Sequence, residues 1–135
     1  MGQQQLLLIV LGVIIVGIAI VVGINLFNAN SVSANRDAVI ADLNNLAAQA
    51  HQYYIRPTSM GGGGNSFLNF AIPAGFNSNA NGTYTISTAG SATSITFQGV
   101  GTAKVPGSSN FVTMQLEVVG PNATSPKADS VMTVY

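Results

Sequence analysis

The sequence predicts an α+β fold in which a long N-terminal α-helix packs on a small C-terminal antiparallel β-sheet of about four strands. Three observations support this prediction: an uncharged apolar run near the N-terminus, a helical periodicity that continues from it, and four later runs that alternate apolar and polar residues. A chain of 135 residues accommodates one such domain, because single hydrophobic cores usually form in units of roughly 100–200 residues.

The apolar run covers residues 6–24 and contains no charged or polar side chain. At about 1.5 Å of rise per residue, a helix of this length spans a hydrocarbon layer of roughly 30 Å. Orientation in a bilayer is normally set by Lys or Arg beside the span, yet the first basic residue here is Arg36. We therefore expect a membrane-spanning helix whose precursor carries a short basic leader that is removed.

Apolar residues continue at helical steps beyond the apolar run, and no proline occurs before Pro57. We expect one helix over residues 1–56, about 80 Å long, with 1–27 as the membrane segment and 28–56 as an amphipathic half. Its first half then needs partners outside its own domain. Five residues of the second half are expected to pack the helix on the sheet: Val39, Leu43, Leu46, Ala50 and Tyr53.

Glycine and asparagine weaken parts of this helix. Gly12, Gly17 and Gly23 lower the helix propensity of the apolar half and are expected to give it flexibility. The junction at residues 25–35 is rich in Asn and Ser, which are mediocre helix formers. We expect the helix to bend or melt locally there.

Pro57 is expected to end the helix, and residues 57–82 to form a Gly- and Asn-rich loop that is flexible at residues 59–66. The β-rich region at 83–135 contains four runs expected to be half-buried antiparallel strands, at 83–88, 93–98, 111–119 and 130–135. The chain is expected to reverse at Asn81-Gly82 and at Ala89-Gly90-Ser91, with glycine supplying a positive φ.

Composition and residue types argue against several classes of function. Four basic and four acidic side chains give a formal net charge of zero, so no nucleic-acid partner is expected. The absence of cysteine removes disulfides, thiolate metal sites and thiol catalysis. The single histidine, His51, has no second histidine to complete a metal set, and Asp37, Asp42, Glu117 and Asp129 are scattered. We expect no enzymatic activity, no metal and no cofactor.

Two triplets match the N-glycosylation acceptor pattern, Asn81-Gly82-Thr83 and Asn122-Ala123-Thr124. Such triplets are common in a chain rich in Asn and Thr. Asn81 and Asn122 are therefore candidate modification sites, with ordinary turns as the alternative.

The chain resembles a type IV pilin in the layout of its whole length. The most specific part of the resemblance is Met1-Gly2-Gln3-Gln4-Gln5-Leu6-Leu7-Leu8-Ile9-Val10, which is similar to a mature pilin start after a prepilin peptidase has cut behind a leader glycine. The resemblance implies that Met1 is N-methylated. It also implies that the residues facing neighbouring subunits in a filament core are Gln5, Leu6, Leu7, Ile9, Val10, Val13, Ile14, Val16, Ile18, Ile20, Val21 and Ile24.

One position departs from the family. The family usually has a glutamate where this chain has Gln5, and that carboxylate is thought to neutralise a neighbouring subunit's terminal amine. Gln5 still accepts a hydrogen bond from an amine, and a neutral amide costs less than an unpaired carboxylate in an apolar core. The helix-kinking proline and the paired cysteines that are frequent in the family are also missing.

The function implied by the resemblance is that of a structural subunit. It would polymerise with copies of itself into an extracellular filament at the cell surface, for adhesion, motility or surface attachment. Before assembly it would lie in the inner membrane and meet the prepilin peptidase and the pilus assembly machinery. The alternatives are a pseudopilin of a secretion system, an archaeal pilin with a full two-sheet β-sandwich, and a single-pass membrane-anchored binding module.

Overall fold

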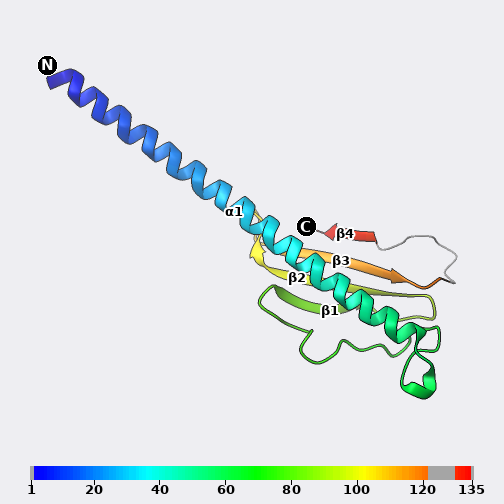
Figure 1. The fold of residues 1–135 in the computed structure, drawn as a ribbon. Coiled ribbons are helices and arrows are strands. Elements are labelled where there is room, and N and C mark those ends of the chain that lie inside the picture. The colour runs from blue at the N-terminus through cyan, green and yellow to red at the C-terminus, as the bar shows by residue number, and fades with distance from the viewer. Residues whose placement is uncertain (1, 122–129, 135) are drawn as a thin grey trace.

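The computed structural model describes residues 2–121 completely and the backbone of residues 130–134. One helix, α1 (Gly2–Ile55), is followed by a short 3-10 helix, η1 (Thr58–Met60), and by four strands. The strands are β1 (Gly82–Thr88), β2 (Ser94–Lys104), β3 (Phe111–Val119) and β4 (Ser130–Val134). Figure 1 shows that the second half of α1 crosses the sheet, while the first half extends away from it as a straight rod. The predicted α+β fold is confirmed.

Helix α1 is continuous over 54 residues. The local bend or melting that we expected at residues 25–35 is not seen, since the backbone is helical throughout this stretch. At about 1.5 Å per residue the helix is about 80 Å long. It ends at Ile55, two residues before Pro57, because proline disfavours the helical conformation of the residue that precedes it.

The start of the loop after the helix is hydrogen-bonded to the helix end, and the flexibility expected for this loop stays a prediction. The amide of Gly63 donates to the carbonyl of Tyr53 at 2.8 Å, and the amide of Asn65 donates to that of Tyr54 at 2.8 Å. The last carbonyls of an α-helix lack partners within the helix, so the loop caps them. A Cβ on Gly62 or Gly63 would collide with backbone, which explains why glycine occupies both positions.

The four strands form one antiparallel sheet in the order β1-β2-β3-β4. This is a meander, in which each strand pairs with the next in sequence. The described residues therefore form a single sheet on a helix, not the two-sheet sandwich that the archaeal alternative would require.

Strand β2 continues six residues past its predicted end at residue 98, through Gly99 and Gly101. Both glycines are required by the close approach of α1. A Cβ on Gly99 would lie 2.7 Å from Cγ1 of Val39, and one on Gly101 would collide with Oδ1 of Asn35. Glycine inside a strand often marks such an approach of another element.

The chain reverses at both predicted sites, but the predicted positive φ of their glycines is wrong. Neither Gly82 nor Gly90 has a positive φ. A Cβ on Gly82 would collide with the carbonyl oxygen of Val100, and one on Gly90 with that of Phe67. The reversal before β1 is instead organised by Asn79, whose Oδ1 accepts the backbone amides of Asn81 and Gly82 at 2.9 and 3.1 Å.

The hydrophobic core lies between the second half of α1 and one face of the sheet. Four of the five predicted packing residues, Val39, Leu43, Leu46 and Ala50, are at most 1% exposed. The fifth buried position is Tyr54 and not Tyr53. The two tyrosines lie three and four residues after Ala50, so either one could continue the buried stripe, and the position of the sheet decides between them. Tyr53 is half-buried and donates a hydrogen bond to the carbonyl of Leu68 at 2.8 Å.

Candidate functional site

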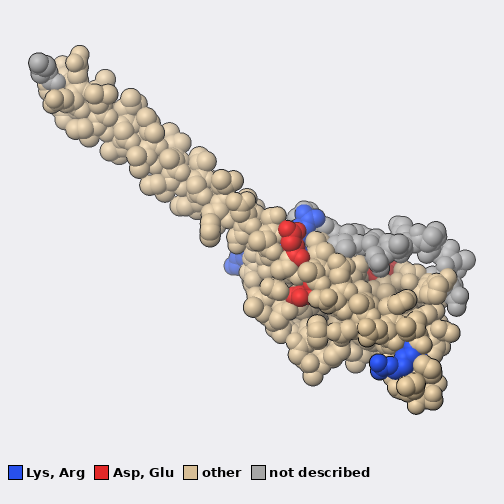
Figure 2. Space-filling view, in the orientation of Figure 1, with Lys and Arg blue, Asp and Glu red and all other residues tan. Residues whose placement is uncertain are grey.

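The candidate functional surface is the first half of α1, residues 2–31, all of which are exposed; we call it the exposed segment. Its large apolar side chains from Leu6 to Phe27 are 51–73% exposed. Figure 2 shows a rod on which no charged atoms are seen, joined to a globular part on which the visible charged atoms lie. Every apolar residue that we predicted for a filament core lies on this rod, and Gln5 is exposed at its tip.

The exposed segment is apolar on every side, unlike the amphipathic second half. Sequence reasoning named only part of this surface; equally exposed large apolar residues are Leu8, Leu11, Ile15, Val22, Leu26 and Phe27. A helix that is hydrophobic all round is stable only where all its faces are buried, in a large core or in a membrane. Each large apolar side chain gains about 1.5–3 kcal/mol on burial, so the whole segment gains tens of kcal/mol from a partner.

The glycines of the exposed segment lie in open space in the single chain. A Cβ on Gly12, Gly17 or Gly23 would meet nothing within 4 Å. Small residues let neighbouring helices approach closely in apolar surroundings. Because the helix is unbroken at these positions, their predicted contribution to flexibility stays a prediction.

The exposed segment meets the globular part through Asn35. Its Nδ2 donates to the carbonyl of Asn81 at 2.8 Å, and its Oδ1 accepts the amide of Ala103 at 3.1 Å. One helical side chain therefore ties both β2 and the start of β1 to α1. These hydrogen bonds hold the helix to the sheet next to the point where the rod leaves it.

A second tie to the helix is a polar cluster around Asp42. Its Oδ2 accepts hydrogen bonds from the Tyr84 hydroxyl at 2.6 Å, Asn79 Nδ2 at 2.8 Å and Asn81 Nδ2 at 2.9 Å. Burial alone would raise the pKa of Asp42, but the three hydrogen bonds outweigh burial and lower that pKa. Burial and the adjacent carboxylate raise the pKa of the Tyr84 phenol. The cluster holds the loop before β1 against the helix.

This cluster bears on the candidate glycosylation sites. Nδ2 of Asn81 is the atom that a glycan would modify, and here it is engaged by Asp42 in a half-buried position. A glycan would replace one of the two hydrogens of this Nδ2 at a half-buried, hydrogen-bonded position, so the structure disfavours modification of Asn81. Asn122 lies outside the described residues.

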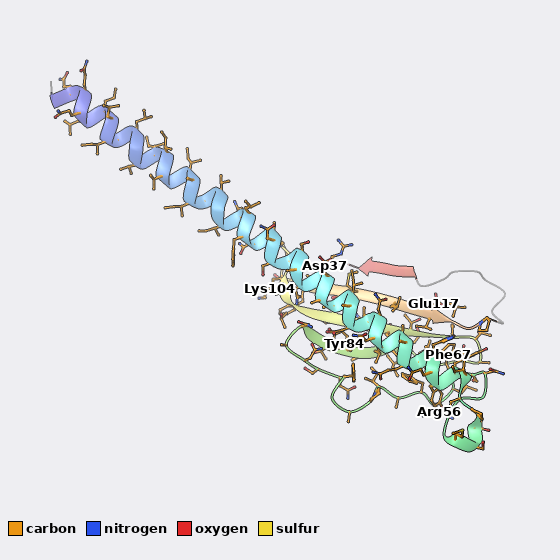
Figure 3. All side chains as sticks on the ribbon, in the orientation of Figure 1. Asp37, Arg56, Phe67, Tyr84, Lys104 and Glu117 are labelled. Atoms are coloured by element: carbon orange, nitrogen blue, oxygen red, sulfur yellow. The ribbon has the colours of Figure 1, made fainter. Side chains whose placement is uncertain are left out.

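An open cleft of about 310 Å³ lies at the point where the exposed segment leaves the sheet; we call it the neck cleft. The helix contributes Asn28 and Ser31, and the hairpin between β2 and β3 contributes Lys104 and Pro106. The Lys104 ammonium lies 5.5 Å from the centre of the Phe111 ring. Figure 3 places Lys104 at this end of the globular part. The sequence did not predict that Lys104 lies beside the helix, because this contact depends on how the hairpin folds.

The residues considered for catalysis or metal binding do not form a site in the part of the chain that is described. No group of three or more His, Asp or Glu side chains there is placed to hold a metal ion. His51 is exposed and stacks on Tyr54, with ring centroids 6.3 Å apart. Asp37 and Glu117 lie on different elements, well apart in Figure 3. Asp129 falls outside the described residues.

No family model, curated protein or solved structure matches this chain. What the structure shows is an architecture: a long helix, apolar and exposed in its first half, packed through its second half on a small antiparallel sheet. This architecture is pilin-like. Its exposed apolar helix indicates membrane association or a secretion signal.

Proposed function

We propose that this protein is the structural subunit of an extracellular, type IV pilus-like filament that polymerises through its N-terminal helix. The observation that carries the proposal is the exposed segment, in which the large apolar side chains from Leu6 to Phe27 are at least half exposed. Adhesion, motility or surface attachment is the role that such a fibre would serve. The chain itself acts as a building block and not as an enzyme.

The apolar surface of the exposed segment can be buried first in a membrane and later in a filament. Before assembly, a bilayer accepts it, because its length matches the hydrocarbon thickness and a helix satisfies its own backbone hydrogen bonds. After assembly, equivalent segments of neighbouring copies would cover one another. A second copy of the chain is thus the partner that we propose, with the inner membrane, the prepilin peptidase and the assembly machinery acting earlier.

The face of the sheet turned away from α1 supports a place on the outside of a fibre. Thr85 pairs with Gln98 in the sheet register, and Gln98 pairs with Gln115. All three alternate with the buried residues of their strands and so point away from the helix. Glu117 lies on the same face, paired with Thr96 in the register. A polar face of this kind remains hydrated at the surface of a fibre.

The test is microscopy of material sheared from the surface of the source cell, with and without the gene for this chain. We expect filaments only when the gene is present, and an intact subunit mass that begins at an N-methylated Met1. A protein that remains a stable monomer in detergent, from cells without filaments, would instead support a membrane-anchored binding module. Short assemblies confined to the cell envelope would support a pseudopilin.

A further inference from the structure

We infer that the neck cleft and the β2–β3 hairpin form a docking surface for the headgroups of anionic membrane phospholipids. This inference rests on the membrane-embedded stage of the proposed function. The surface is defined by Asn28 and Ser31 of α1 and by Lys104 and Phe111 at the base of the hairpin. The lipid phosphate is the group that it binds.

The position of the neck cleft along α1 sets its depth in a membrane. If residues 6–24 span the hydrocarbon layer, Asn28 lies four residues, or about 6 Å, beyond its edge, and Ser31 about 10 Å beyond it. A headgroup layer is roughly 5–8 Å thick, from a total bilayer thickness of about 40–45 Å and a hydrocarbon core of about 30 Å. Asn28, on the helix side of the neck cleft, therefore lies within the headgroup layer, and Ser31 lies just beyond it.

The neck cleft has a cation from the hairpin. No Lys or Arg occurs in residues 2–35, and the first basic residue of the helix, Arg36, lies about 18 Å beyond residue 24. The hairpin places Lys104 beside helix residues 28–32, at a sequence distance of more than seventy residues. Lysine binds phosphate as a point charge, and a basic residue near an anionic membrane surface is attracted to it.

Polar and aromatic side chains surround the Lys104 ammonium. The Asn28 amide and the Ser31 hydroxyl are hydrogen-bond donors suited to phosphate oxygens. Phe27, next to Asn28 in the chain, is 73% exposed, and Phe111, next to the Lys104 ammonium, is 42% exposed. Amphipathic residues with an apolar body and a polar partner suit the membrane interface. The Lys104 ammonium over the Phe111 ring provides such a pair.

The experiment uses the full chain, which contains no cysteine, so that a single introduced thiol can carry a fluorescent probe. Ser109→Cys places the probe on the exposed hairpin, and Ile14→Cys places it in the exposed segment. Each labelled protein is reconstituted in vesicles of phosphatidylcholine alone or with phosphatidylglycerol. Quenchers attached to the headgroup, held in the acyl chains or dissolved in water then report the depth of each probe.

We expect headgroup quenching of the probe at residue 109 to be stronger in the vesicles that contain phosphatidylglycerol. Lys104→Gln should weaken docking on those vesicles by roughly fivefold, the effect of one basic residue near an anionic surface. Lys104→Arg should restore it. The matched control is Arg56→Gln, which removes one charge from the opposite end of the globular part and should change nothing (Figure 3).

Two results would overturn the inference while leaving the proposed function intact. The first is a probe at residue 109 that is quenched only from water, although the probe at residue 14 lies in the acyl chains. The second is quenching of the probe at residue 109 that does not depend on lipid charge but changes with the density of protein in the membrane. That result would assign the neck cleft to a second copy of the chain. A probe at residue 14 outside the acyl chains would refute both the inference and the membrane stage of the proposed function.

Discussion

The two halves of helix α1 are parts of one unbroken element with opposite surroundings. In residues 32–55, which we call the packed segment, apolar residues form one stripe, and the sheet buries that stripe. In the exposed segment the apolar residues cover every side, and no part of its most apolar stretch is buried. The width of the apolar surface thus distinguishes two kinds of helix. A narrow stripe is buried by the helix's own domain, whereas an apolar surface on every side needs a membrane or other subunits to bury it.

The largest expected effect comes from placing a charge in the exposed segment. Ile14→Asp should abolish filament formation, because a carboxylate at the centre of an apolar span costs about 2.5–3.5 kcal/mol per subunit on insertion scales. Gln98→Glu adds the same charge on the far face of the sheet and should leave filaments intact. Fibre yield after shearing measures both, and normal yield from Ile14→Asp would refute the assignment of this segment to a buried core.

A pair of identical substitutions sharpens the comparison within one helix. Leu46, 1% exposed, and Leu8, 66% exposed, are both changed to alanine. In detergent-solubilised monomer, Leu46→Ala should lower the free energy of unfolding of the globular part by about 2–5 kcal/mol, and Leu8→Ala should leave it unchanged. Denaturant titration followed by tyrosine fluorescence provides the measurement. Equal losses would mean that the exposed segment also packs on the sheet.

The Asp42 cluster provides a smaller, pH-dependent effect in the packed segment. Because the pKa of Asp42 is lowered in the folded protein, its contribution to stability is present above its ordinary value of 3.8. That contribution is lost as the pH falls through the lowered pKa. Asp42→Asn should therefore cost about 1–2 kcal/mol at neutral pH, where the charged hydrogen bonds exist, and little at low pH.

Unfolding titrations of wild type and Asp42→Asn at pH 7 and at pH 2–3 measure this difference. Tyr84→Phe removes only the shortest of the three hydrogen bonds and should lose part of the same stability. A difference between wild type and Asp42→Asn that stayed constant with pH would show that the Asp42 charge is not responsible.

The smallest effect is expected at the tip of the exposed segment, at Gln5. If its amide hydrogen-bonds the Met1 amine of a neighbouring subunit, Gln5→Leu should weaken assembly by roughly 0.5–1.5 kcal/mol. Gln5→Glu should be tolerated, because a carboxylate pairs with the amine. Thermal disassembly of filaments compares the variants. Loss of filaments in Gln5→Glu, with Gln5→Leu indistinguishable from wild type, would contradict the proposed contact.

Local periodicity predicted much of this fold. The helix was expected to end near residue 56 and ends at Ile55, and the third strand was expected at Phe111–Val119 and occupies those residues. Repeats of two and 3.6 residues are properties of neighbouring positions, so a sequence displays them directly. The apolar character of the exposed segment is visible for the same reason.

Features that depend on contacts between distant residues could not be read in this way. The extension of β2 through Gly99 depends on Val39 of the helix, and the Asp42–Tyr84 hydrogen bond joins residues 42 positions apart. The choice of Tyr54 over Tyr53 depends on where the sheet lies. The presence of Lys104 beside the helix depends on the path of a hairpin. None of these has a signature within a short window of sequence.

Helical reconstruction of the assembled fibre by electron cryomicroscopy tests the central claim most directly. We expect the density for residues 6–27 to lie at the fibre axis, with each apolar helix surrounded by equivalent helices from neighbouring copies and with the sheets on the outside. The side chain at residue 14 should be completely buried between subunits. A fibre in which this segment is exposed at the surface, with the sheets packed at the axis, would contradict the account.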